Sequence, residues 1–152
     1  MLSADELAGV VDLFGALSRP ELSEALSELA YRRGEDPPEE IVEDAVAAFA
    51  LVGFVDDGHR LFAPGPAAFP TLPEGAEDLP HILDQQPRSV DRAAVAEAAA
   101  DRLRTEAACA ATLGATDRAE RLVDISYDLE TWAAIDLSGV RSRLDATLDG
   151  TN

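Results

Sequence analysis

Side chains that act as nucleophiles or metal ligands are few in this sequence, and they lie far apart along it. The histidines are His59 and His81, and the single cysteine is Cys109. A structural zinc site needs several Cys or His ligands, and a serine nucleophile needs a histidine as its base. Ser126 and Ser138 have no histidine near them in the sequence, and no glycine-rich loop or lysine suggests a phosphate site. We therefore expect no metal, no cofactor and no catalytic residue, and we expect that the protein is not an enzyme.

Cys109 lies in the alanine-rich stretch AACAATL, which has helical character. No histidine or arginine stands beside it at helical spacing, so we expect a small buried hydrophobic residue and not a reactive thiol. A lone cysteine forms no internal disulfide, which fits a reducing cytoplasm. The N-terminal residues lack the basic start of a signal peptide, and no apolar stretch is long enough to span a membrane. We expect a cytoplasmic protein with no membrane partner.

Basic side chains suited to nucleic-acid backbones are also scarce. The candidates are Arg32 and Arg33, at the end of an expected helix, and Arg60, in an expected hairpin. Contacts to phosphate are one interpretation of all three. The other is structural: a helix C-terminus favours positive charge, and Arg60 has Asp56 and Asp57 within reach across the hairpin.

The chain as a whole is strongly acidic. Its 152 residues include 30 Asp and Glu against 12 basic residues, all arginine, for a net charge of −18. Such a surface repels polyanions and itself, and salt screens that repulsion. The charge has two interpretations, adaptation to a salt-rich environment or a specific acidic docking face such as a DNA mimic.

The first half of the chain contains three sequence patterns that predict helices. Ser3 and Ser18 each precede a glutamate by three residues, and Asp36 precedes Glu39 in the same way, which is typical of a capped helix start. Apolar residues follow each start at helical spacing. We expect the first helix to carry its stripe to Leu17, the second to end at Gly34, and the third to run from Pro38 to Val52.

A short hairpin follows, and then a change of composition. Phe54-Val55 and Leu61-Phe62 flank Asp56-Asp57-Gly58, and an Asp-Gly step between such segments indicates a tight turn. Six prolines between residues 63 and 87 indicate a linker with one short helical turn near residues 80–85. We expect a first domain at residues 1–70, a proline-rich linker at 71–88 and a helical unit at 89–150.

The last unit shows three further helical stripes. We expect a helix capped by Ser89 and ending before Gly114, a second that begins at Thr116 or Asp117 and carries Trp132, and a short third one. Leu122, Leu129, Trp132 and Leu144 lie on the two later stripes and are candidate interface residues. Each stripe needs an apolar partner, either the core of this unit or another molecule, and both readings of the Trp132 stripe remain open.

Three helices followed by AFALVGFVDDGHRLFAPG resemble a winged helix-turn-helix domain, with the end of a recognition helix running into a wing. The resemblance covers residues 1–70. The lysine-free composition and the segment LFGALSR also resemble a small uncharacterised family of acidic haloarchaeal proteins. The fold class we expect is mainly α with a small β-hairpin, a winged-helix-like head plus a C-terminal helical hairpin.

In DNA-binding winged-helix proteins the third helix enters the major groove. Here that helix carries Glu39, Glu40, Glu43 and Asp44 and no basic or amide side chain, so phosphate repels it and bidentate base contacts are missing. The hypothesis is a non-catalytic protein-interaction or regulatory module of a halophilic archaeon, with a protein partner or a second copy. The alternative is a DNA-binding winged-helix transcriptional regulator.

The charge generates the first prediction, that the fold depends on salt. The Debye length falls from about 10 Å at about 0.1 M salt to about 3 Å at about 1 M, which removes most of the repulsion among carboxylates. We expect cooperative thermal unfolding by circular dichroism in about 2 M KCl and a loss of helical signal on dialysis to about 0.05 M. An unchanged spectrum and melting temperature across this range would contradict adaptation of the charge to salt.

Overall fold

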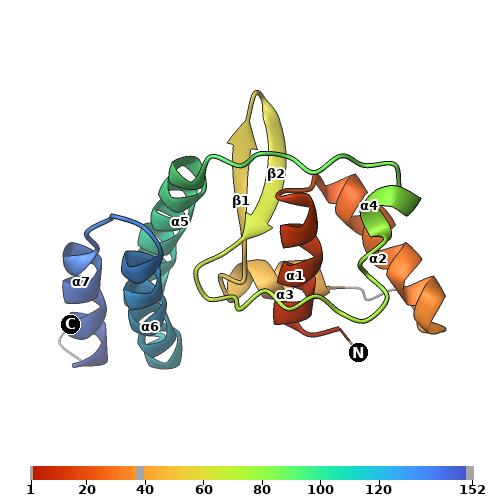
Figure 1. The fold of residues 1–152 in the computed structure, drawn as a ribbon. Coiled ribbons are helices and arrows are strands. Elements are labelled where there is room, and N and C mark those ends of the chain that lie inside the picture. The colour runs from red at the N-terminus through yellow and green to blue at the C-terminus, as the bar shows by residue number, and fades with distance from the viewer. Residues whose placement is uncertain (1, 37–39, 150–152) are drawn as a thin grey trace. The chain divides into compact units, whose positions relative to one another are not determined.

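The structure, a computed structural model, describes residues 2–36 and 40–149 (Figure 1). It divides into two compact units, residues 1–91 and 92–152. The described parts are mainly helical with one two-stranded antiparallel sheet, as predicted. The first unit holds α1 (Ala4–Phe14), α2 (Arg19–Arg33), α3 (Ile41–Ala47), β1 (Leu51–Asp56), β2 (His59–Pro64) and α4 (Leu79–Ile82). The second holds α5 (Arg92–Leu113), α6 (Thr116–Trp132) and α7 (Ser138–Leu148).

The first two helix starts are confirmed as capping boxes. The Ser3 hydroxyl accepts the N–H of Glu6, whose carboxylate accepts the N–H of Ser3, and Ser18 and Glu21 repeat the arrangement. α2 ends at Gly34, which adopts the left-handed conformation. α1 ends at Phe14, earlier than the apolar stripe suggested. The expected third cap, Asp36-Pro37-Pro38-Glu39, includes residues that lie outside the described ranges.

The prediction that the third helix runs to Val52 is wrong. α3 ends at Ala47, and the chain turns there through Phe49, whose φ is +62°. The N–H of Ala50 donates to the carbonyl of Ala45 and that of Phe49 to the carbonyl of Val46, which is a Schellman ending. Such endings favour glycine at the position that Phe49 occupies. The apolar residues here therefore gave no sequence signal that the helix ends at this point. Val52 lies in β1 instead.

The hairpin is confirmed at the predicted turn. Asp57 and Gly58 both have positive φ, as a type I′ turn requires, and Asp56 pairs with His59 on either side of it. β2 also meets the α1–α2 connection, where the backbones of Leu17 and Phe62 exchange two hydrogen bonds of 3.0 and 2.8 Å. The hairpin is thereby attached to the helices by its second strand.

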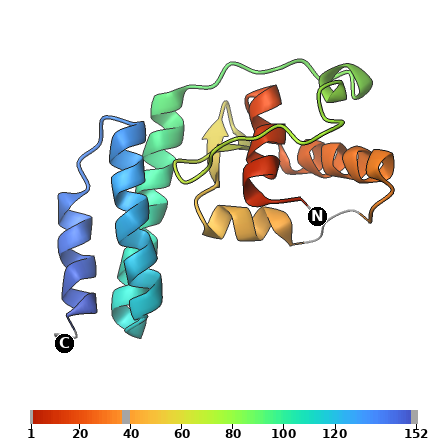
Figure 2. The same ribbon diagram turned by 60° about the horizontal axis from the view of Figure 1, so that its bottom comes forward.

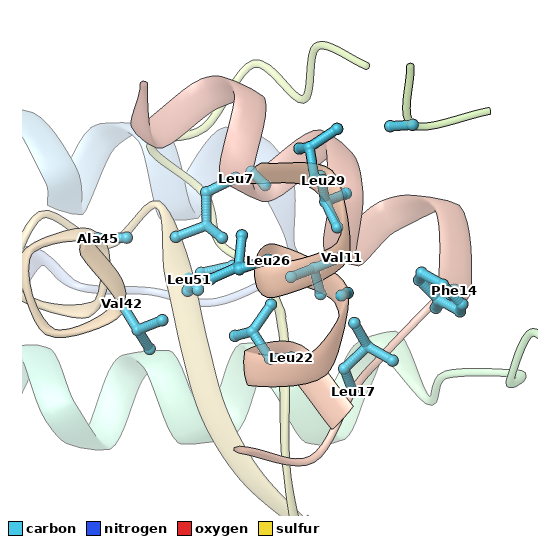
Figure 3. Packing of buried hydrophobic residues seen from close by; sticks show 14 of the residues in the cluster. Leu7, Val11, Phe14, Leu17, Leu22, Leu26, Leu29, Val42, Ala45 and Leu51 are labelled. Carbon is cyan, nitrogen blue, oxygen red and sulfur yellow. The ribbon is translucent and has the colours of Figure 1, made fainter. Parts of the chain in front are cut away.

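The core of the first unit lies where α1, α2, α3 and β1 meet (Figure 3). The predicted stripes of the first two helices are buried, including Leu17, which lies just beyond α1. Apolar burial of this kind contributes about 25 cal/mol per Å². The side chains labelled in the figure come from these four elements and from the α1–α2 connection: Leu7, Val11, Phe14, Leu17, Leu22, Leu26, Leu29, Val42, Ala45 and Leu51.

The segment of residues 65–91, here called the strap, differs from the expected linker because it belongs to the first unit. Figure 1 shows it passing α1 on its way to α4. The N–H of Thr71 donates to the carbonyl of Asp5 at 3.0 Å, and that of Phe69 to the Asp5 carboxylate at 3.1 Å. A Cβ on Gly9 would lie 2.0 Å from the Thr71 carbonyl oxygen, so the strap needs a glycine in the middle of α1.

Arg88 anchors the far end of the strap. Its guanidinium binds both carboxylate oxygens of Glu21, at 2.7 and 3.0 Å, and also donates to the carbonyl of Ala16. Its own N–H donates to the carbonyl of Phe14 at 2.8 Å. The Arg88 guanidinium, with the N–H of Ser18, lowers the pKa of Glu21 from 4.5 to about 2. Arg88 therefore holds the strap against the α1–α2 corner.

The second unit is a bundle of three helices that run side by side (Figure 2). Its core is formed by residues of α5 and α6 at three- and four-residue spacing, together with Leu144 of α7. α5 begins at Arg92, so Ser89 is not adjacent to its first residue and the predicted cap is wrong. Gly114 ends α5 with a φ of +62°, as predicted.

A second arginine clamp joins α6 to α7. Arg141 pairs with Glu130 at 2.8 Å, donates to the hydroxyl of the buried Ser126 at 3.2 Å and lies 4.2 Å from the ring centre of Tyr127. Glu130 also accepts the N–H of Leu137 at 2.6 Å. Arg141 and this N–H lower the pKa of Glu130, so the carboxylate stays ionised. The clamp fixes the α6–α7 connection.

The Arg88 clamp predicts an acid-sensitive contribution to stability. Because folding lowers the pKa of Glu21 from 4.5 to about 2, its contribution is complete above about pH 5 and is lost as the pH falls toward 2. Glu21→Gln should lower the free energy of unfolding by about 1–3 kcal/mol at pH 7, allowing for partial solvent screening. Chemical denaturation of variant and wild type across pH should show this difference shrinking in acid.

Glu24→Gln is the matched control, because Glu24 is an exposed carboxylate of the same helix. It should change stability by less than about 0.5 kcal/mol. A pH-independent difference for Glu21→Gln, or equal effects of the two variants, would contradict the assigned role of Arg88.

Candidate interaction surfaces

The exposed face of α3 is formed by carboxylates. Val42 and Ala45 point into the core, while Glu40, Glu43 and Asp44 are exposed. Glu43 pairs with Arg19 of α2 at 2.7 Å, and its own backbone N–H and Arg19 lower its pKa. The described residues of this helix place no basic or amide group on that face. Glu39, the other carboxylate predicted here, lies outside the described ranges.

Arg32 and Arg33 lie at the end of α2, as predicted, and both are engaged within the chain. Arg32 lies 3.6 Å from Glu28 and donates to the carbonyl of Gly75 in the strap at 3.2 Å. Arg33 pairs with Glu35 at 3.0 Å. These contacts give both residues a structural role at a helix C-terminus, where positive charge is favourable.

Arg60 lies on β2 with its guanidinium over the ring of Phe62, 5.8 Å from the ring centre. Within the described ranges it forms no ion pair with Asp56 or Asp57, the partners considered from the sequence. It is exposed on the hairpin. No contact in those ranges joins it to Arg32 or Arg33, so the three candidate residues do not form one bonded cluster.

Most arginines of this chain are occupied by intramolecular contacts. At least eight of the twelve form ion pairs, and Arg92 stacks on Trp132, 4.0 Å from the ring centre. A phosphate that binds one of these guanidinium groups has to compete with a carboxylate of the same chain. The paired residues are Arg19, Arg32, Arg33, Arg88, Arg102, Arg104, Arg118 and Arg141.

The candidate interface residues of the second unit are mostly in its core. Leu122, Leu129 and Leu144 are each 0% exposed, so they are not available at the surface. Trp132 is half-buried beneath Arg92. The stripe is therefore satisfied within the chain.

Cys109 is exposed, and the prediction that it is buried is wrong. Ala107 and Ala110 are the residues that α5 buries at this level. Because each residue turns a helix by about 100°, Cys109 lies about 200° from Ala107 and points away from the core. The spacing of the buried stripe already contained this information.

A pocket of about 340 Å³ lies between α5 and the start of α7. It is lined by Arg104, Ala107, Asp136, Gly139, Val140 and Arg143. Arg104 pairs with Asp101 at 2.9 Å, and Asp136 accepts the N–H of Ser138 at 3.0 Å. The lining brings together no nucleophile and base.

The chemistry-bearing residues singled out from the sequence are scattered in the structure. His59 lies on β2, His81 on α4, and both are exposed. Within residues 2–36 and 40–149, no three Cys, His, Asp or Glu side chains are grouped to hold a metal ion. In the same ranges, no helix combines the length and apolar character needed to cross a membrane.

Comparison with known proteins identifies one relationship. A family model described as a family of unknown function (DUF7109) matches residues 5–149, almost the whole chain. No curated protein and no solved structure matches the chain.

Burial of Leu129 generates a prediction for the second unit. Leu129→Asp would place an unpaired charge in the core of the bundle, at a cost of more than about 3 kcal/mol. In about 2 M KCl we expect limited proteolysis to degrade residues beyond 92 while the first unit resists. Ala134→Asp adds the same charge at an exposed position and should leave the cleavage pattern unchanged. Equal resistance of both variants would mean that this face of α6 is not buried.

Proposed function

This chain belongs to a family of unknown function (DUF7109), and we propose that it is a non-catalytic protein-interaction or regulatory module. In this proposal the first unit acts as a winged-helix-like docking domain that recognises a protein and not DNA. It assigns no reaction to the chain.

Support for the winged-helix-like reading comes from the order of elements. Three helices precede a two-stranded antiparallel hairpin, and the hairpin follows α3 directly. That order is shared with domains that bind DNA and with domains that bind proteins, so it favours an architecture and leaves the partner open. The chemistry of the exposed faces has to decide between them.

The observation that carries the proposal is the acidic face of α3. In the DNA-reading arrangement this helix would approach phosphates with Glu40, Glu43 and Asp44 exposed. Glu43 is held ionised by its own backbone N–H and by Arg19. Carboxylates at this position oppose a duplex and favour a partner that carries Arg or Lys.

The charge of the whole first unit extends this argument. Residues 1–91 contain 19 carboxylates and five arginines, a net charge of −14. A protein with a basic surface would be steered toward this unit, and screening by salt would limit non-specific contacts. We propose that the setting is the cytoplasm of a halophilic archaeon, where such a surface remains soluble.

A DNA-binding regulator is the second candidate, and the observation in its favour is Arg60. This residue is exposed on the hairpin, the place from which a wing contacts the DNA backbone. One cation on the hairpin supplies a small part of the several phosphate contacts that DNA-binding proteins use.

Two measurements distinguish these functions. The first is selection of binding sites from random DNA duplexes, at a KCl concentration that keeps the protein folded. We expect this selection to recover no defined DNA site, because α3 repels phosphate. Recovery of a defined operator would favour the regulator.

The second measurement is a pull-down from lysate kept in molar KCl. The double variant Glu40→Gln with Asp44→Asn should lose bound proteins that wild type retains.

The control for the pull-down is Glu74→Gln with Glu77→Gln. These two carboxylates are exposed on the strap of the same unit, so the variant has the same charge as the α3 variant. It should retain the bound proteins. Equal loss from both variants would show that net charge, and not the face of α3, determines binding.

A further inference from the structure

Negative charge is distributed unevenly along this chain. Residues 101–122, which form the second half of α5 and the start of α6, contain four arginines and four carboxylates and have no net charge. The remainder of the chain contains eight arginines and 26 carboxylates. The entire excess of −18 therefore lies outside this region.

Within the region, one face of α5 is exposed and uncharged. Thr105, Cys109 and Thr112 are exposed at three- and four-residue spacing, and Leu113 beside them is 79% exposed. Here this set of four residues is called the Cys109 face. Its first three side chains are small, so a second helix can approach closely, and Leu113 supplies apolar area that water covers in the isolated chain.

The charged residues at the edge of the Cys109 face are already paired within the chain. Asp101, one turn before Thr105, lies 2.9 Å from Arg104. Glu106 lies 3.4 Å from Arg102 of its own helix and 3.4 Å from Arg118 of α6. The only carboxylate between residues 102 and 116 is thus neutralised by two guanidinium groups. A molecule that covers the face does not have to desolvate an unbalanced charge.

We propose that the Cys109 face binds the same face of a second copy of this chain. A twofold interface places each patch against itself, so a patch with net charge would meet its own sign. Two chains of −18 repel one another over most of their surfaces, and that repulsion is weakest where the local charge is zero. An uncharged face within a neutral region thus fits a second copy, whereas the acidic face of α3 fits a different, basic partner.

The pairing that this face supports is an antiparallel crossing of two α5 helices near Cys109. In that arrangement Leu113 of each copy lies against Thr105 of the other, because each is four residues from the crossing point. The two Cys109 thiols face one another across the twofold axis. High salt favours the contact by strengthening apolar burial and by screening the remaining carboxylates.

Sedimentation equilibrium of the full chain in about 2 M KCl tests the proposal. We expect wild type at twice the chain mass of 16.1 kDa and Leu113→Glu at 16.1 kDa. Val55→Glu is the matched control, because Val55 is 67% exposed on the hairpin and receives the same charge, and it should keep the doubled mass. A wild-type mass of 16.1 kDa, or a doubled mass for Leu113→Glu, would overturn the proposal.

Cross-linking locates the interface. A short bis-maleimide should join two wild-type chains through Cys109 and should join neither Cys109→Ser nor Leu113→Glu chains. Cys109→Ser should still sediment at the doubled mass, because the contact does not depend on a disulfide. A wild-type dimer that the reagent fails to join would place the interface elsewhere and refute the assignment. This result does not depend on which protein the first unit binds.

Discussion

The carboxylate of Glu21 joins two parts of the first unit directly, and a third through Arg88. It accepts the N–H of Ser18 and so completes the start of α2, and it binds both terminal nitrogens of Arg88 at the end of the strap. Arg88 in turn donates to the carbonyls of Phe14, the last residue of α1, and of Ala16, two residues further on. A bidentate pair has a fixed direction as well as a charge. The α1–α2 corner and the strap are therefore determined together, and the core beneath them is closed by a segment without regular structure over most of its length.

Arg141 and Glu130 form the corresponding connection in the second unit, where only a few residues join α6 to α7. Both clamps use a planar guanidinium with several directed donors, which a lysine ammonium cannot reproduce. A chain with arginine as its only cation thus uses its few positive charges as internal connections. The consequence for function is direct: carboxylates remain at the surface, and phosphate meets few unoccupied cations.

The local features of this fold were predictable, and the long-range ones were not. Ser3, Ser18 and the Asp57-Gly58 turn act over three or four residues, so their spacing predicts their structure. The strap depends on contacts between residues more than 60 positions apart, such as Arg88 with Glu21, and its prolines resemble those of a free linker. Gly9 was the available signal, since a glycine in the middle of an apolar helix indicates the close approach of another backbone. The end of α3 had no such signal, because Phe49 occupies a position that favours glycine.

The candidate surfaces, too, include some that the sequence predicted and some that it did not. The carboxylates of α3 were predictable because a polar residue opposite a buried stripe has to be exposed. Cys109 was misplaced because alanines on all sides of α5 obscured the buried stripe, although the spacing of that stripe leaves Cys109 exposed. Charge also separates the two units: residues 1–91 have a net charge of −14 and residues 92–152 one of −4. Because like charges oppose self-association and favour partners of opposite sign, the charge of the first unit supports the proposal that it binds a different, basic protein. The smaller net charge of the second unit accordingly supports the proposal that another copy binds there.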